Sequence, residues 1–388
     1  MSCPPSHHTS PEPEIGSGSP PPPTISAFPE ASDPKRVALI SQIFNENQLS
    51  SVDSITWALV WLADLSALEA MVTISSIPYG RMVTKDQLST DRFPVIKEWL
   101  LRFRNPAAKN DDEGTAWSGR PTGGNTKSSS QTCDDPGEAT LKRDRHKCIV
   151  TKAGEPNDAA HIFGRALGIR HQQKDAHEAF WETLKLFWST ERIKNWHEAV
   201  FGVEGTETPK NMMTLNKTVH ALWGKARFAF RPIQSTATEL KMELHWLPGP
   251  EKNKINLCEK PKDGRPAASL LNCRLWDCEN FDMIVSGHLI TLTTSDPEKM
   301  PLPSFAILEL QWFLTRVATM SGAADFVEPD DENDDELYGV TSRALALEEA
   351  IVPEPPQSQR RARPRQESPG TQKETPSPGV FPSRHSLR

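Results

Sequence analysis

Two short stretches decide the fold that this sequence predicts. The first is Asp158-Ala159-Ala160-His161-Ile162, and the second, Asn211-Met212-Met213-Thr214-Leu215, is followed closely by His220. We expect His161 to end a β-strand, Asn211 to open a short helix, and His220 to lie on that helix. The three polar side chains would then converge on one site from a hairpin and a helix.

These three residue types together suit the hydrolysis of a phosphodiester bond. A neutral imidazole is a sound base near pH 7, so His161 would deprotonate a water molecule. The amide of Asn211 would hold the loop that carries His161 and fix the orientation of the imidazole. His220 would bind a divalent metal ion, with Mg²⁺ expected first and Mn²⁺ or Zn²⁺ as alternatives.

The motifs around these residues resemble the HNH endonuclease family, most closely a branch found in fungal proteins. The resemblance rests on Cys148-Ile149-Val150-Thr151, Ala160-His161-Ile162-Phe163, and Asn211-Met212 with Leu215 and His220. It extends over residues 143–250 and loosely to Ala324. It implies a ββα-metal core and a metal-dependent endonuclease that acts on DNA rather than RNA.

The chain departs from the family pattern beside the first histidine. Many members place Asp, Glu or His directly before it as a metal ligand, and here that position is Ala160. Asp158 lies on the same strand face as Ala160, so it can join His220 as a ligand only if the strand bends. We expect Ala160→Asp to leave activity unchanged or to raise it.

None of the six cysteines belongs to a CxxC pair, whereas many HNH domains hold a structural zinc with two such pairs. Thr151 stands where Cys148 would have its partner, so we expect no structural zinc and a buried Cys148. The start MSCPPSHHTS has no apolar leader segment. We therefore expect free thiols and an intracellular protein of the nucleus or cytoplasm.

The charges are segregated along the chain. The formal net charge is -7, yet residues 143–231 carry fifteen Lys and Arg against ten Asp and Glu, a net of +5. A locally basic site suits nucleic acid as the partner.

The apolar run 55–72 contains Asp64 and Glu69, which favours a buried helix over a membrane span, so no membrane partner is expected. The sequence does not identify protein partners.

The fold class is expected to be α+β, with the ββα-metal core embedded in a larger body of helices and strands and with disordered termini. Periodicity predicts helices at 34–44, 55–72, 93–103, 175–188, 191–201 and 304–320, and strands at 147–151, 227–232, 242–247 and 288–292. The expected organisation is a disordered Pro/Ser-rich segment (1–33), a helical region (34–104), a linker (105–142), the nuclease domain (143–250), accessory strands with a C-terminal helix (251–325) and an acidic, then basic, disordered tail (326–388).

Several other residues are weaker candidates. His146, His171, His177 and His197 lack ligand spacing and are expected at the surface or at helix caps. Arg165, Arg170, Lys225, Arg227 and the basic cluster 360–365 could contact phosphates, and the cluster could also be a nuclear-import signal.

Three functions follow from these residues. The favoured one is a DNA endonuclease with His161 as base, Asn211 as the orienting residue, and His220 with Asp158 as metal ligands. The second is a catalytically silent HNH-derived module that binds nucleic acid or a protein. The third is a scaffold whose acidic and Pro-rich tails hold partners.

Overall fold

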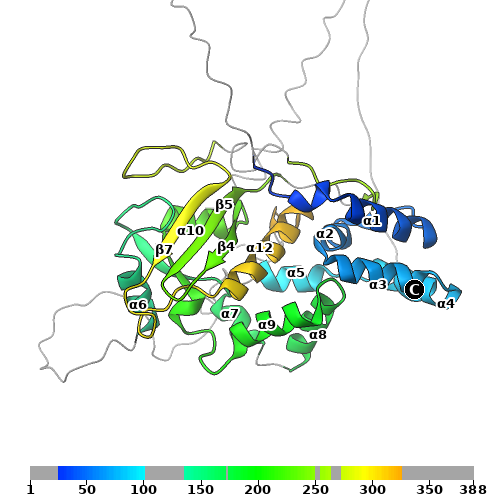
Figure 1. Cartoon of the computed structure of the whole chain (residues 1–388), viewed down its shortest axis with the longest axis horizontal. Helices are drawn as coiled ribbons and strands as arrows, with labels where there is room; N and C mark the ends of the chain where they lie inside the picture. Colours follow the sequence, from blue (N-terminus) through cyan, green and yellow to red (C-terminus); the bar gives the residue numbers. More distant parts are fainter. Residues whose placement is uncertain (1–24, 101–134, 172–173, 250–253, 264–271, 326–388) are drawn as a thin grey trace, which may run out of the picture. The chain divides into compact units, whose positions relative to one another are not determined.

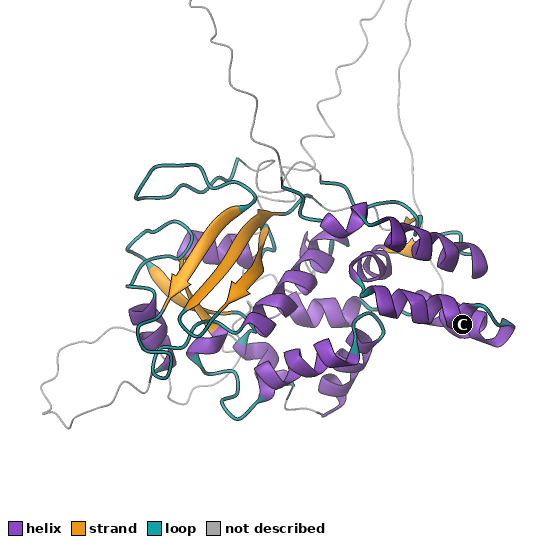
Figure 2. Cartoon of the chain, in the orientation of Figure 1, coloured by secondary structure: helices purple, strands orange, loops and turns teal. Residues whose placement is uncertain are grey.

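The computed structural model describes residues 25–100, 135–171, 174–249, 254–263 and 272–325. Residues 1–24 and 326–388 of the predicted tails, most of the predicted linker and the cluster 360–365 lie outside these residues. Residues 25–33 were also predicted to be disordered, but here Ala27 and Phe28 are buried and Pro29–Ser32 form a 3₁₀ helix. The described part is an α+β protein, as predicted. Most helices gather at one side and the three longest strands at the other (Figure 2).

The region predicted to be helical holds five α-helices where three were predicted. They are α1 (Pro34–Glu46), α2 (Ser54–Leu62), α3 (Leu65–Ser75), α4 (Pro78–Ser89) and α5 (Phe93–Leu100). The single helix predicted at 55–72 breaks at Asp64, because the Asp64 carboxylate accepts hydrogen bonds from Ser189 N and Arg192. No single described helix is long and apolar enough to cross a membrane; α2 and α3 reach that length only together, bent by 114°.

A three-stranded antiparallel sheet forms the other side. It contains β4 (Phe228–Ser235), β5 (Glu239–Trp246) and β7 (His288–Thr293), in the order β4-β5-β7. All three strands were predicted. On the central strand Leu240, Met242 and Leu244 are buried, and the alternating residues between them are half-exposed, so one face of the sheet packs into the core.

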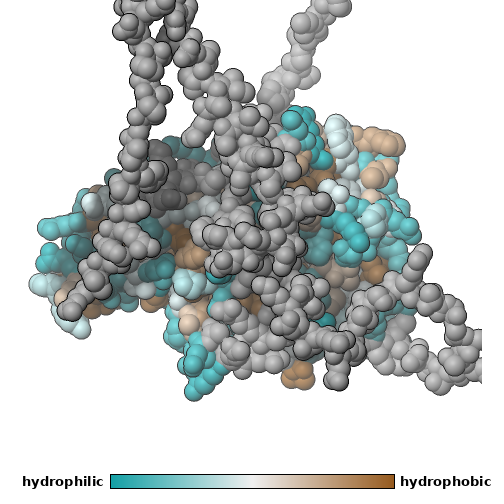
Figure 3. Space-filling model, turned by 180° about the vertical axis from the view of Figure 1, so that it is seen from behind, coloured by the Kyte–Doolittle hydropathy of each residue, from teal (hydrophilic) through white to brown (hydrophobic). Residues whose placement is uncertain are grey.

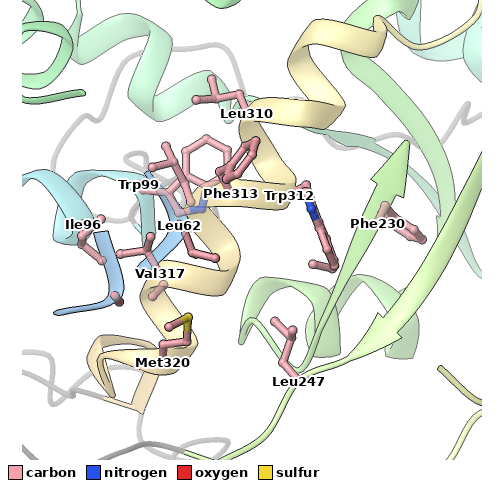
Figure 4. Close-up of a cluster of buried hydrophobic side chains, with 14 of the residues drawn as sticks. Leu62, Ile96, Trp99, Phe230, Leu247, Leu310, Trp312, Phe313, Val317 and Met320 are labelled. Carbon is pink, nitrogen blue, oxygen red and sulfur yellow. The ribbon is translucent and has the colours of Figure 1, made fainter. Parts of the chain in front are cut away.

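Helix α12 (Phe305–Met320) lies between the sheet and the helices (Figure 1). Ser304 caps this helix, since its Oγ accepts a hydrogen bond from Ile307 N. In Figure 4, Trp312 points toward Phe230 and Leu247, on the side of the sheet. Every residue from Ile307 to Met320 is buried except Glu309. This is the pattern of a helix that forms the centre of a core.

The predicted ββα core is present. Strands β2 (Asn157–His161) and β3 (Met212–Asn216) pair antiparallel, and α10 (Lys217–Gly224) follows directly. The connection between the two strands carries α7 (Arg165–Arg170), α8 (Lys174–Lys185), α9 (Thr190–Phe201) and the 3₁₀ helix η4 (Pro209–Asn211). Helix α9 is capped by Ser189, whose side chain accepts a hydrogen bond from Arg192 N.

Two local predictions in this core were wrong. Residues 147–151 form turns and not a strand, because the backbone takes positive φ at His146 and Lys152 and folds back on itself. Asn211 does not open a helix but precedes β3. The four residues after it are all buried, which suits a strand in the core, and α10 begins only at Lys217, capped by Asn216.

Helix α6 (Pro136–Arg143) occupies the end of the predicted linker. Its last residue, Arg143, is fully buried and forms a salt bridge with Asp144 at 2.8 Å. The guanidinium also donates to the carbonyl oxygens of Pro209, Met212 and Pro301 at 2.8 to 2.9 Å. We call this set of contacts the Arg143 clasp. It ties α6 to both β3 and the segment before α12. The remaining short elements are η1 (Pro29–Ser32), β1 (Val52–Asp53) paired with β6 (Lys254–Ile255), and η5 (Ala323–Asp325).

Candidate active site

The hairpin places the two histidine-bearing elements together. His161 ends β2 opposite Met212, and Asp158 lies three residues earlier, opposite Leu215. Buried neighbours hold His161 on both sides, since Ala160 and Ile162 lie in the core. The His161 side chain itself is 23% exposed, so it lies at the rim of the core and is open to solvent.

Asn211 fixes two backbone segments, the one that follows β2 and the one that precedes η4. Its fully buried side chain accepts a hydrogen bond from Phe163 N at 2.8 Å and donates to Phe163 O at 2.9 Å. It also donates to Thr206 O at 2.9 Å. The prediction that Asn211 bonds to the backbone near His161 is confirmed. One amide therefore holds two loops, and the imidazole follows the first of them.

The surroundings of His161 favour its neutral form. Burial lowers the pKa of His161 below its usual range, and the charges of Arg165 and His220 act in the same direction. The Glu207 carboxylate opposes them, with Oε1 3.2 Å from His161 Nε2. A neutral imidazole near pH 7 can accept a proton, as a general base must. The charge of His220 contributes to this shift from α10, and the convergence of the two imidazoles on one site stays a prediction.

Asp158 and His220 form a second pair beside the hairpin. His220 Nδ1 lies 3.3 Å from Asp158 Oδ2, and both side chains are partly exposed. The hydrogen bond from His220 lowers the pKa of Asp158 despite the opposing effect of burial, and Lys217 contributes in the same direction. Asp158 is therefore ionised at neutral pH. Asp158 contacts His220 on α10 while β2 keeps its regular pairing with β3, so this contact does not need the predicted bend in the strand.

The comparison with protein families agrees with this geometry. Residues 148–231 match the family model described as HNH endonuclease. We call residues 148–231 the HNH segment. The match lies inside the range 143–250 that the motifs predicted. It ends within β4, so the family segment includes the hairpin, its long connection, α10 and the first half of that strand. No curated protein and no solved structure matches the chain.

The HNH segment offers two groups that fit a divalent metal ion. A carboxylate oxygen and an imidazole nitrogen are ligands that such ions accept, and here they lie 3.3 Å apart at a partly exposed place. Within the described ranges no set of three His, Cys, Asp or Glu side chains is arranged to hold a metal. A metal ion would therefore take two protein ligands here and fill its other positions with water or phosphate oxygens.

The structure changes one prediction, because Ala160 is buried against the core beside Met213. A carboxylate at position 160 would point into apolar surroundings and could not act as a ligand. We now expect Ala160→Asp to destabilise the fold by about 3–5 kcal/mol, as an unpaired buried charge does. Denaturant unfolding would measure the loss, with Ala159→Asp at the partly exposed neighbouring position as the control. Equal stability of the two variants would contradict this expectation.

Of the weaker candidates, Arg165 lies beside Glu207, with its Nε 3.8 Å from Glu207 Oε1, and the following residues lie elsewhere. His171 is buried beside Phe163 and is not at the surface, while His177 and His197 contact each other with their Nε2 atoms 2.9 Å apart. Arg227 is buried, which removes it as a phosphate contact. The side chain of Arg170 lies outside the described residues.

Glu207 is the site residue that the sequence did not reveal. It lies in the loop between α9 and η4, outside both motifs although only four residues before Asn211, and an acidic residue in a loop rich in Gly and Thr gives no signal by its spacing. Only the fold brings its carboxylate to His161.

Proposed function

We propose that the protein is a metal-dependent endonuclease that hydrolyses phosphodiester bonds in DNA. One observation carries the proposal: the hairpin strand β2 carries both a partly exposed His161, next to the backbone that Asn211 holds, and Asp158, which pairs with His220. The HNH family of the segment supports the same reaction class.

In the proposed reaction His161 takes a proton from a water molecule as the water oxygen attacks the phosphorus. The bond to the leaving oxygen breaks, and the imidazolium later returns its proton to solvent. Asn211 holds the backbone at Phe163 and so keeps the imidazole in place. Since the ring is already held, little ordering is needed when the substrate binds.

Asp158 and His220 would hold the metal ion of this site. When bound, such an ion stabilises the charge that develops on the phosphate and on the leaving oxygen. The ionised Asp158 and the imidazole of His220 supply the negative charge and the lone pair that it needs.

Charge supports nucleic acid as the substrate. Residues 143–231 carry a net of +5 from fifteen basic and ten acidic residues. In addition, no large exposed hydrophobic side chain of the described residues lies on β2, β3 or α10. Hydrophilic and hydrophobic residues are interspersed over the described surface seen in Figure 3. A charged ligand therefore suits this site better than an apolar one.

A second function is a silent module that binds nucleic acid without cutting it. Ala160 and the limit of two ligand groups in the described residues favour this function. Nicking of supercoiled plasmid by the full chain, with Mg²⁺, Mn²⁺ or Zn²⁺ and with EDTA as control, separates the two. Nicking that requires metal supports the endonuclease. Protein that binds the plasmid but never nicks it, with any of the three ions, supports the silent module.

The metal pair gives a separate prediction. We expect His220→Ala to raise the metal concentration for half-maximal nicking about 10–100-fold, because the variant loses one of two protein ligands. Nicking at saturating metal should recover, since the base is intact. His146→Ala removes an exposed histidine outside the site and serves as the control. An unchanged metal dependence in His220→Ala would exclude His220 as a ligand.

A further inference from the structure

The carboxylate of Glu207 lies at the imidazole of His161. Glu207 Oε1 is 3.2 Å from His161 Nε2, and Arg165 Nε lies 3.8 Å from the same oxygen. The contact joins the end of β2 to a loop 46 residues later in the chain.

The loop that carries Glu207 is fixed on both sides of that residue. Before it, Thr206 O accepts a hydrogen bond from the Asn211 side chain at 2.9 Å. After it, Thr208 O accepts from Asn211 N at 2.9 Å. The same asparagine that holds the chain after His161 therefore also holds the loop of Glu207. The two side chains meet because one residue anchors both of their backbones.

We propose that Glu207 is the positioning residue of His161, with its carboxylate accepting the Nε2–H so that Nδ1 is the basic atom. This inference rests on the proposed function for its catalytic meaning. An ionised carboxylate only accepts hydrogen bonds, and a neutral imidazole has one N–H donor. If Nε2 carries the hydrogen, Nδ1 keeps the lone pair. The proton of the attacking water then goes to Nδ1, and the imidazolium that forms has the Glu207 charge beside it.

Three charged groups act on His161 from three different elements. Glu207 belongs to the loop after α9, Arg165 to α7 and His220 to α10. Only Glu207 is negative, so it alone stabilises the imidazolium. Removal of its charge should weaken the base and shift its titration to lower pH, whereas removal of the Arg165 charge should shift it to higher pH.

The hydrogen bond can be tested without any cutting. In ¹⁵N-histidine-labelled full chain, free of DNA and metal, the ring nitrogen shifts of neutral His161 should report the Nε2–H tautomer. In Glu207→Ala they should move toward a mixture of tautomers. An Nδ1–H tautomer in the wild-type chain, or an unchanged tautomer in Glu207→Ala, would overturn the proposal.

The positioning role is tested by the pH dependence of nicking at saturating metal. Glu207→Gln should lower the rate about 10–100-fold, as the loss of an orienting partner does, and should move the acid limb of the profile to lower pH. Glu204→Gln is the matched control, since Glu204 lies in the same loop but pairs with Lys210 at 2.6 Å. Arg165→Gln should move the acid limb in the opposite direction.

Two outcomes count against the role of Glu207. One is an unchanged acid limb and rate in Glu207→Gln. The other is an unchanged acid limb with a higher metal requirement, which would make Glu207 a ligand. Wild-type protein that never cuts contradicts the proposed function alone, because the tautomer measurement still decides the contact between Glu207 and His161.

Discussion

We expect His161→Ala to lower the rate of plasmid nicking by about 10²–10⁴-fold, the usual cost of removing a general base. Binding of DNA and the melting temperature should stay close to those of the wild type. The His161 side chain lies at the rim, while the buried residues on either side, Ala160 and Ile162, remain in place. Single-turnover nicking at saturating metal measures the chemical step, and a filter-binding assay measures the affinity.

His161→Gln separates the loss of the titratable nitrogen from the loss of the side chain's size. Gln keeps a polar side chain of similar length but has no titratable nitrogen, so it should be as inactive as Ala. Nicking that survives both substitutions would exclude His161 as the base. A large fall in melting temperature would show instead that the imidazole contributes mainly to the fold.

Asn211→Ala should have the largest combined effect on stability and activity. It leaves Phe163 N, Phe163 O and Thr206 O without the partner that each has now. The two bonds to Phe163 are buried, and a buried polar group without a partner costs about 1–3 kcal/mol, so we expect a loss of about 2–6 kcal/mol of unfolding free energy. Both loops beside His161 lose their anchor, so nicking should fall further than the unfolded fraction explains.

Asn216→Ala provides the control on the same segment. It removes the cap of α10, which should cost about 1 kcal/mol and leave the loops near His161 intact. If Asn211→Ala were no less stable than Asn216→Ala, the anchoring role of Asn211 would be wrong. If it lost stability but kept full specific activity, only its effect on the imidazole would be wrong.

The sequence predicted the parts of the site that rest on short-range pattern. His161 at a strand end, His220 on a helix and the long strands β4 and β5 follow from alternation and motif spacing, which are local properties. The role of Asn211 toward the backbone near His161 was also predicted correctly. Its element was not, because a run of buried residues has no periodicity that separates a strand from a helix.

Other features depend on contacts between distant segments. Glu207 contacts His161 because Asn211 holds both of their loops. The predicted helix breaks at Asp64 because Arg192 and Ser189 bind its carboxylate. No composition or spacing near either residue signals these contacts. The same holds for Ala160, whose small size is required by the buried face of β2.

The Arg143 clasp has a consequence for any transfer of the HNH segment into another protein. Arg143 lies before the first residue of the HNH segment. Its guanidinium donates to the carbonyl oxygen of Met212, inside the segment, and to that of Pro301, which lies after the segment in the chain. A graft of residues 148–231 onto another protein would leave the Met212 carbonyl without its donor and cut β4 from its partner β5. Gene fusions or recombination events that carry the HNH segment intact should therefore include both α6 and α12.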